Sequence, residues 1–267
     1  RFSNENEPPP LALLEFNSKI YSYDDLVRCL RDIGIKDGDT LCVHTELITL
    51  GRPLVGKDEF LGLIVRAFYE VIGMAGTLIM PTFTYSFCKN QIYDKRHSRS
   101  TMGLLTEYYR HCDGVVRTDD PIFSFAISGA NMSEYLGRRP TCFSKGCVYD
   151  KLRQNGGKIV LFGLEHLGYT FTHYLEEQIG VSYRYFKRFS GMMIDENGVQ
   201  TKQEIDYYVR YIDRTSEMSV PKQIEILKRS NNFNLVPFGG AMIVAIDAQK
   251  YYDETYKAIM ESESNIL

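Results

Sequence analysis

The sequence predicts an α/β protein: an α/β/α sandwich with a mixed, partly antiparallel central sheet. Short buried-strand patterns alternate with amphipathic helical patterns, which is typical of a sheet with helices on its faces. Residues 194–200 have Asp195-Glu196-Asn197-Gly198 at their centre, which predicts a hairpin and hence an antiparallel part. The chain of 267 residues shows no linker, so we expect a single domain over residues 1–267.

The first four elements alternate between helix and strand. Residues 23–32 have apolar side chains at helical spacing, and Ser22 is placed to act as the N-cap. Residues 40–44 form a short apolar run that predicts a buried strand. A second helix is predicted over residues 57–71, and a second strand over residues 77–80.

The later elements follow from the same two periodicities. Helices are predicted at residues 102–111, 172–178, 221–229 and 248–260. Strands are predicted at residues 123–128, 158–162, 207–212 and 241–246.

The composition is that of an ordinary globular protein and excludes several classes of function. The net charge is −3, so no basic face for nucleic acid is expected. No apolar run approaches the roughly 18 residues that span a bilayer, and the N-terminus lacks a signal pattern. We therefore expect a cytoplasmic protein with neither nucleic-acid nor membrane partners, while the oligomeric state is not indicated.

The six cysteines do not form a metal motif. They lack any Cys-x-x-Cys or paired Cys/His spacing, so no metal site is expected. Cys88 follows an aromatic-rich loop, and a hydrolase with Cys88 or a serine as nucleophile is one alternative. That reading needs a Gly-x-Ser-x-Gly-like elbow, which the sequence does not contain.

His173 is the candidate general base. It follows the buried strand pattern 158–162 and Gly163, in the first turn of a predicted helix with hydroxyls and carboxylates beside it. Enzymes with α/β folds place catalytic groups at such strand ends, and these neighbours suit a histidine that titrates near neutrality. The alternative is a hydrogen-bonded packing residue.

Five short motifs in order resemble the aminoglycoside 3-N-acetyltransferase family over nearly the whole chain. They are Val43-His44-Thr45 with Leu50-Gly51, Gly76-Thr77-Leu78-Ile79-Met80-Pro81-Thr82-Phe83, Gly103-Leu104-Leu105-Thr106-Glu107 with Arg110, Arg117-Thr118-Asp119-Asp120-Pro121 with Ser124, and residues 170–176. The resemblance implies an acetyltransferase domain with acetyl-CoA as co-substrate and no metal. It also implies transfer of an acetyl group to a primary amine of an amino sugar.

The resemblance also implies catalytic roles for individual residues. His173 matches the catalytic histidine of the family, as the base that takes the proton of the amine. Asp213 lies where the family carries an acid after a late strand, and we assign it to orient the imidazole; Glu176 is the competing candidate. A hydroxyl or backbone N–H of Thr82 or Thr118 is expected to stabilise the thioester oxyanion.

The coenzyme is expected to contact three of these segments. The family lines its pantetheine groove with the segment that corresponds to His44, Thr45 and Glu46, although Glu46 replaces a usual serine. Further cofactor contacts are assigned to Phe83, Arg117 and Thr118. Asp120 replaces a usual histidine and receives no role, while Lys187 and Arg188 are phosphate candidates or solvated surface.

The acceptor is expected to be a small amino sugar. Glu107, Tyr169 and Tyr174 are the candidate acceptor contacts, and Tyr169 and Tyr174 belong to an aromatic cluster near His173 that suits a sugar ring or a nucleobase. We therefore favour an endogenous or nucleotide-linked amino sugar. The alternatives are an aminoglycoside resistance enzyme and a coenzyme A-binding module without turnover.

Overall fold

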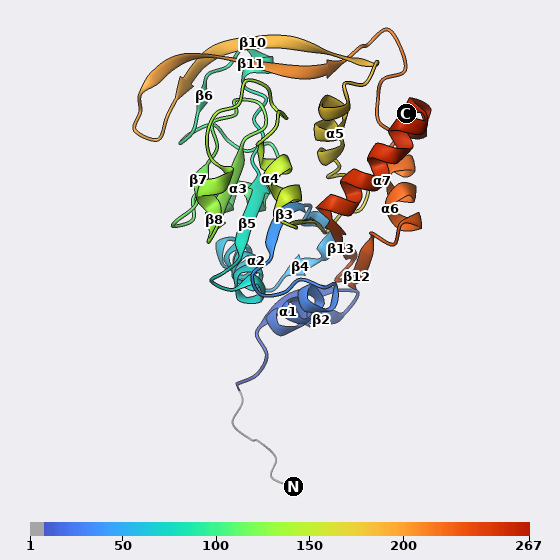
Figure 1. The fold of residues 1–267 in the computed structure, drawn as a ribbon. Helices are drawn as coiled ribbons and strands as arrows, with labels where there is room; N and C mark the ends of the chain where they lie inside the picture. Colours follow the sequence, from blue (N-terminus) through green and yellow to red (C-terminus); the bar gives the residue numbers. More distant parts are fainter. Residues whose placement is uncertain (1–7) are drawn as a thin grey trace.

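A seven-stranded mixed sheet forms the centre of the molecule in the computed structural model, which describes residues 8–267 (Figure 1). Its order is β12 (Asn234–Phe238), β13 (Ala241–Asp247), β9 (Lys158–Phe162), β3 (Thr40–Thr45), β5 (Thr77–Pro81), β8 (Phe125–Gly129) and β7 (Val116–Arg117). The three central strands are parallel, and the two strands on each side are antiparallel to their neighbours. The predicted fold class is confirmed.

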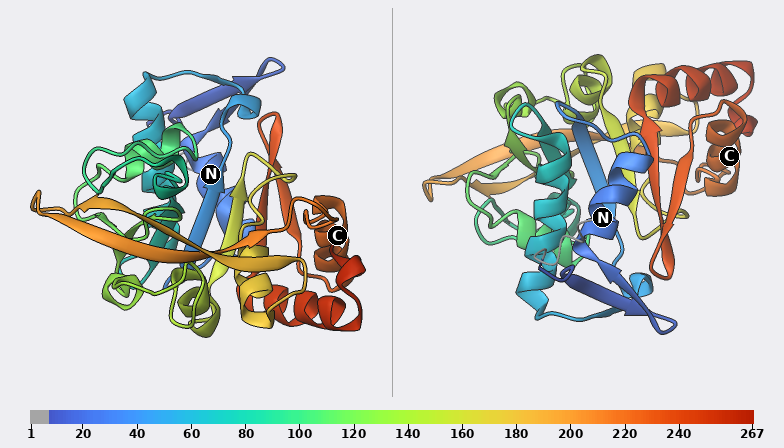
Figure 2. Two further views of the ribbon diagram at one scale, coloured as in Figure 1. Left: turned by 90° about the horizontal axis from the view of Figure 1, so that it is seen from above. Right: turned by 90° about the horizontal axis from the view of Figure 1, so that it is seen from below.

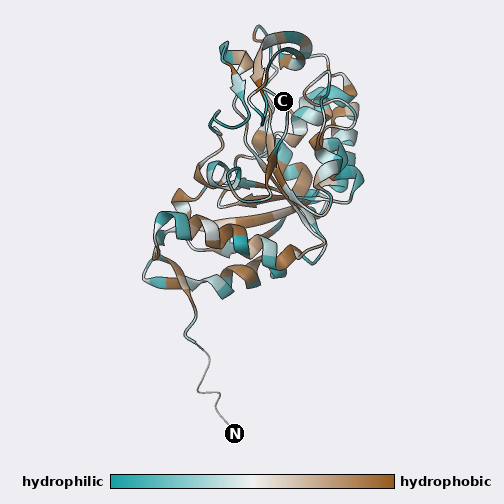
Figure 3. Ribbon diagram, turned by 90° about the vertical axis from the view of Figure 1, so that its left-hand side faces the viewer, coloured by the Kyte–Doolittle hydropathy of each residue, from teal (hydrophilic) through white to brown (hydrophobic). Residues whose placement is uncertain are grey.

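Helices cover both faces of this sheet, as the views along and across it show (Figures 2 and 3). One face carries α1 (Tyr23–Asp32), α2 (Lys57–Ile72) and α3 (Leu104–Tyr109); the other carries α4 (Val148–Gln154), α5 (Phe171–Ile179) and α7 (Ala248–Glu261), with α6 (Val220–Arg229) against α7. In Figure 3 the lower helices carry many apolar segments, and the buried apolar side chains of α1 and α2 share one core cluster with β3 and β5. Ser22 caps α1 in a capping box with Asp25, as the sequence predicted.

The side chains of β3 alternate between the two hydrophobic cores. Leu41 and Val43 pack with α1 and α2, while Cys42 packs on the opposite side with α4 and α5. His44 lies two residues after Cys42 and so projects from the same face as Cys42. This alternation directs His44 toward the face that carries α4 and α5.

A long hairpin crosses the top of the molecule above α5 (Figures 1 and 2). It consists of β10 (Arg184–Ile194) and β11 (Gln200–Arg210), which pair along their full length, and β6 (Tyr93–Asp94) adds a short parallel strand. The predicted turn is confirmed. However, the hairpin forms a separate sheet, and its second strand ends at Arg210 rather than at residue 212.

A third, small sheet was not predicted. It consists of β1 (Ala12–Phe16), β2 (Lys19–Ser22) and β4 (Arg52–Pro53). The turn between its first two strands holds Asn17 and Ser18 at φ 48° and 64°. The usual sequence signal for such a turn is an Asn-Gly pair. Because a serine replaces the glycine here, the sequence did not predict the turn.

Residues 8–267 also contain four short 3₁₀ segments: Ile48–Leu50, Phe87–Lys89, Met132–Tyr135 and Glu263–Asn265. The predicted helix at residues 102–111 shortens to α3, which starts after Gly103 at φ 103°. Within residues 8–267 no helix is both long and apolar enough to cross a membrane.

Candidate active site

His173 and Glu176 form a hydrogen-bonded pair on α5. The imidazole Nδ1 lies 2.7 Å from Glu176 Oε1, because residues three apart share one face of a helix. The Glu176 side chain is fully buried, whereas that of His173 is 26% exposed. The loop after β9 thus places an imidazole at the surface with a buried carboxylate behind it.

Arg184, the first residue of β10, completes this cluster. Its Nε lies 3.1 Å from Glu176 Oε2, and its Nη1 donates to the carbonyl oxygen of Tyr208. Its Nη2 lies 3.0 Å from His173 Nδ1. The sequence interpretation missed Arg184, because its contact with α5 depends on how the hairpin returns over that helix.

The carboxylate decides which ring nitrogen of His173 carries the proton. An ionised carboxylate only accepts hydrogen bonds, so the shorter contact assigns the proton to Nδ1, whose N–H donates to Glu176. With Nδ1 protonated, the nearby Arg184 Nη2 makes no hydrogen bond to that nitrogen. Burial alone would raise the pKa of Glu176, but the hydrogen bond from His173 and the positive charge of Arg184 outweigh it and hold that pKa below its ordinary value. Nε2 is then left with its lone pair, as a general base requires.

His173 lines a cleft of about 440 Å³ at the open end of the hairpin, where Arg184 and Arg210 pair. Its lining consists of His173, Arg184, Tyr207, Val209, Arg210, Ile212, Glu217, Met218 and Val220. The walls therefore come from α5, from both hairpin strands and from the segment that leads into α6 (Figure 1). A small molecule in this cleft has direct access to the imidazole.

Asp213 does not orient the imidazole, and this prediction is wrong. Its side chain is 70% exposed and pairs with Arg214 at 3.2 Å. The reason is that β11 ends at Arg210, so the chain has left the sheet before it reaches Asp213. The competing candidate, Glu176, makes the contact instead.

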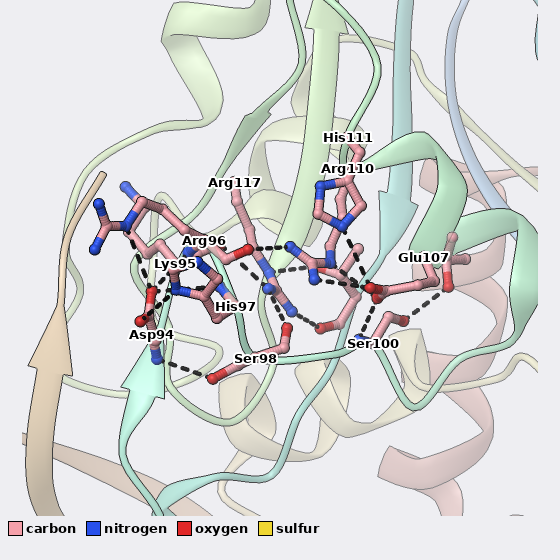
Figure 4. A network of polar contacts seen from close by, with 12 residues as sticks. Asp94, Lys95, Arg96, His97, Ser98, Ser100, Glu107, Arg110, His111 and Arg117 are labelled. Carbon is pink, nitrogen blue, oxygen red and sulfur yellow. Dashed lines mark hydrogen bonds and ion pairs between the residues drawn. The ribbon is translucent and has the colours of Figure 1, made fainter. Parts of the chain in front are cut away.

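The buried guanidinium of Arg117 joins several loops through hydrogen bonds, which is a structural role rather than a cofactor contact (Figure 4). Its guanidinium donates to the carbonyl oxygens of Thr82 at 2.8 Å and Ser98 at 2.5 Å. It also donates to the hydroxyls of Thr82 and Ser124. Burial lowers the pKa of Arg117. Each of its three nitrogens already donates to a protein oxygen.

The two threonines expected to stabilise the oxyanion already form hydrogen bonds within the protein. The Thr82 hydroxyl lies 3.0 Å from Ser124 Oγ, and its N–H donates to the Ser124 carbonyl. Thr118 exchanges hydrogen bonds with Phe125, accepting the Phe125 N–H at its hydroxyl and donating its own N–H to the Phe125 carbonyl. Both threonines therefore link their own segment to the neighbouring segment that holds Ser124 and Phe125.

The end of β3 carries polar atoms without partners. Both ring nitrogens of His44 and the hydroxyl of Thr45 are buried and lack a hydrogen bond to any residue from 8 to 267. Burial lowers the pKa of His44 to about 4, so its imidazole is neutral near pH 7. Buried polar groups without a partner are costly, and amide groups of a pantetheine arm are suitable partners for them.

Two neighbours assigned to the cofactor have other contacts. Glu46 Oε1 accepts the N–H of Ile48 at 3.1 Å. Phe83 is fully buried and packs edge-on against Phe123 and Phe125. Phe83 is therefore a core residue. Of the three predicted pantetheine contacts His44, Thr45 and Glu46, only His44 and Thr45 have buried polar atoms without a hydrogen bond to the described residues.

The three assigned acceptor contacts lie outside the cleft. Arg110 holds Glu107 through both carboxylate oxygens at 2.7 and 2.8 Å, and these hydrogen bonds outweigh burial to lower its pKa to about 2. Tyr169 donates to the carbonyl oxygen of Glu165, and Tyr174 to Asp150. These side chains are structural, and none of them lines the cleft at His173.

The two basic hairpin residues also have protein partners. Arg188 pairs with Asp206 at 2.9 Å. The ammonium of Lys187 lies 5.1 Å from the centre of the Phe189 ring. This geometry fits the interpretation of Lys187 and Arg188 as solvated surface residues better than that of a phosphate site.

A family model described as aminoglycoside 3-N-acetyltransferase matches residues 42–260. The chain belongs to this family. The match covers most of β3, all of α5 and the hairpin, and every residue of the cleft. Among the residues that the structure describes, no group of His, Cys, Asp and Glu side chains is arranged to hold a metal ion.

Two curated members of the aminoglycoside 3-N-acetyltransferase family show the sequence similarity. Aminoglycoside N(3)-acetyltransferase IX of Micromonospora chalcea is 26% identical over 168 residues, which cover 55% of this chain and 58% of that protein. Aminoglycoside N(3)-acetyltransferase VII of Streptomyces paromomycinus is 26% identical over 187 residues, with coverage of 62% and 64%. The chain thus matches about three fifths of the length of these relatives.

The fold of the family extends further than this sequence match. The solved structure of AAC-IIIb in a binary complex with CoASH superimposes with a TM-score of 0.77 at 19% identity. The superposition covers 90% of this chain and 97% of the solved chain. At this level of identity the likeness establishes the fold.

Proposed function

We propose that this chain transfers the acetyl group of acetyl-CoA to a primary amine of an amino sugar, with His173 as general base. The observation that carries the proposal is the Glu176–His173 pair at 2.7 Å on the wall of a cleft, in a chain that belongs to an N-acetyltransferase family. The pair has the geometry in which a carboxylate orients an imidazole for proton transfer.

The chemistry follows from these side chains. The ammonium form of the amine first gives one proton to solvent, and His173 Nε2 accepts a second proton as the neutral nitrogen bonds to the acetyl carbon. Glu176 holds the proton on Nδ1 and stabilises the imidazolium that forms, and Arg184 keeps Glu176 ionised. When the carbon–sulfur bond breaks, the imidazolium returns the proton to the departing sulfur. No net proton remains on the protein after one turnover.

His44 and Thr45 are proposed to hold the pantetheine arm. Their three buried polar atoms lack protein partners, and they lie at the carboxyl end of the parallel strand β3, next to β9 and the loop that leads to His173. Ligands of α/β sheets bind at this end of the strands. The solved AAC-IIIb, of the same fold, was crystallised with coenzyme A.

Acetyl-CoA is therefore expected to stabilise the folded protein. A ligand at one hundred times its Kd adds about 2.7 kcal/mol to the free energy of unfolding, which raises Tm by several degrees. Thermal melts over a range of acetyl-CoA concentrations measure this rise, and ATP serves as a control that shares the adenosine phosphates but lacks pantetheine. An unchanged Tm at millimolar acetyl-CoA contradicts the donor assignment.

The charges of the cleft favour an endogenous amino sugar, nucleotide-linked rather than polycationic. Arg184 and Arg210 line it against one carboxylate, Glu217, with Glu176 buried behind. A site for a polycation requires more carboxylates than positive side chains. In this cleft lining the arginines outnumber the carboxylates. The second candidate acceptor is an aminoglycoside, which is favoured by the names of both curated relatives.

The salt dependence of the acceptor KM distinguishes these two candidate acceptors. With a nucleotide-linked amino sugar we expect acceptor KM to change little as salt rises, because few charges change partners. An aminoglycoside held by carboxylates loses affinity steeply as ionic strength screens the attraction. Release of the coenzyme A thiol, followed with both acceptors at low and high salt, measures this. Efficient, salt-sensitive acetylation of the aminoglycoside alone contradicts the nucleotide-linked assignment and supports the resistance enzyme.

A further inference from the structure

Arg210 is an arginine of the cleft without a counter-charge. The neighbouring arginines each have a carboxylate partner: Arg184 with Glu176, Arg188 with Asp206, and Arg214 with Asp213. Among residues 8–267 Arg210 forms no ion pair, and its side chain is exposed. It nevertheless lines the same cleft as His173.

The hairpin register increases the positive charge at this point. Arg210 lies directly opposite Arg184 at the open end of the hairpin. Like charges in directly opposed positions destabilise a strand pair. Glu176 balances the charge of Arg184, whereas Glu217, the other carboxylate near the cleft, is not in an ion pair with Arg210. An anion supplied by a ligand would balance the second guanidinium.

From this arrangement we infer that Arg210 binds a phosphate group carried by the amino-sugar acceptor. The inference rests on the proposed acetyl transfer and adds the substrate class. The guanidinium presents a planar set of donors that matches phosphate and carboxylate oxygens. In one cleft, His173 faces the amine and Arg210 the anion.

Coenzyme A is the other source of phosphate, and its geometry disfavours it here. Its thioester must reach the amine beside His173, and its phosphates are separated from the thioester by the whole pantetheine arm. Arg210 and His173 share a cleft of only about 440 Å³. An anion close to the reacting amine belongs to the acceptor.

Binding measurements test this inference independently of turnover. The probes are UDP-glucosamine, glucosamine 6-phosphate, glucosamine and acetyl-CoA, titrated by calorimetry into wild type, Arg210→Gln, Arg210→Lys and the control Arg214→Gln. We expect Arg210→Gln to weaken at least one phosphate-bearing sugar roughly ten- to a hundredfold, the usual worth of a charge-assisted hydrogen bond. Arg210→Lys should retain part of the affinity. Arg214→Gln should match wild type, because Arg214 pairs with Asp213 outside the cleft lining.

Three results overturn the inference: no binding of either phosphorylated sugar to wild type, equal binding by wild type and Arg210→Gln, or a loss confined to acetyl-CoA. The last result would assign the guanidinium to the coenzyme. A parallel thiol-release assay separates this inference from the proposed function. Binding that depends on Arg210 without acetyl transfer contradicts only the reaction, and transfer that is indifferent to Arg210 contradicts only the anion site.

Discussion

His173→Ala is expected to lower kcat by roughly two to four orders of magnitude, the usual contribution of a general base. Even the neutral amine must lose a proton as its nitrogen bonds to the acetyl carbon, and this variant lacks the Glu176-oriented imidazole that is proposed to take it. Acetyl-CoA should still bind, because His44 and Thr45 lie on a different element. Steady-state kinetics give kcat, and thermal melts with acetyl-CoA verify binding.

His166→Ala is a matched control for this variant. His166 lies in the loop before α5, its side chain is 80% exposed, and it does not line the cleft. Its replacement should leave kcat near the wild-type value. Equal activity of wild type and His173→Ala would show that His173 is only a packing residue.

Glu176→Ala is expected to lower the free energy of unfolding by about 3–5 kcal/mol, since it leaves a buried charge without its partner. Arg184 has a side chain only 3% exposed, and Glu176 is its carboxylate partner. The same change frees the imidazole to adopt the wrong tautomer, so kcat should also fall. Urea unfolding at neutral pH measures the stability term.

Asp213→Ala provides the comparison. Asp213 is mostly exposed and touches only Arg214 among the described side chains, and surface substitutions of this kind stay within about 0.5 kcal/mol. Glu176→Ala and Asp213→Ala should therefore differ in both stability and kcat. A larger catalytic loss in Asp213→Ala would restore the acid that the sequence motif suggested.

Local patterns of the sequence were sufficient to predict most of the central fold. The apolar spacing of α1 and the cap at Ser22 are local signals, and both are confirmed. The Asp-Glu-Asn-Gly turn predicted the hairpin correctly. Its place above α5 depends on contacts between distant segments, so the pattern could not distinguish a separate sheet from an edge of the central one. The Asn17-Ser18 turn lacked the glycine that would have marked it.

The site was predictable only where one helix holds both partners. His173 and Glu176 are three residues apart on α5, and this spacing is visible in the sequence. Arg184 joins them from another element, so no spacing rule points to it. The roles assigned from the family motifs were the least reliable predictions. The polar groups of Arg117, Thr82 and Glu107 form hydrogen bonds with other residues of the protein.

The identity of the product tests the central claim most directly. Wild-type protein is incubated with acetyl-CoA and a panel of amino sugars, and the products are analysed by mass spectrometry and NMR. The proposal predicts an amino sugar heavier by one acetyl group, with the acetyl on nitrogen, formed in step with coenzyme A release and lost in His173→Ala. Binding of acetyl-CoA without any acetylated product from sugars or aminoglycosides would contradict it and leave a coenzyme A-binding module.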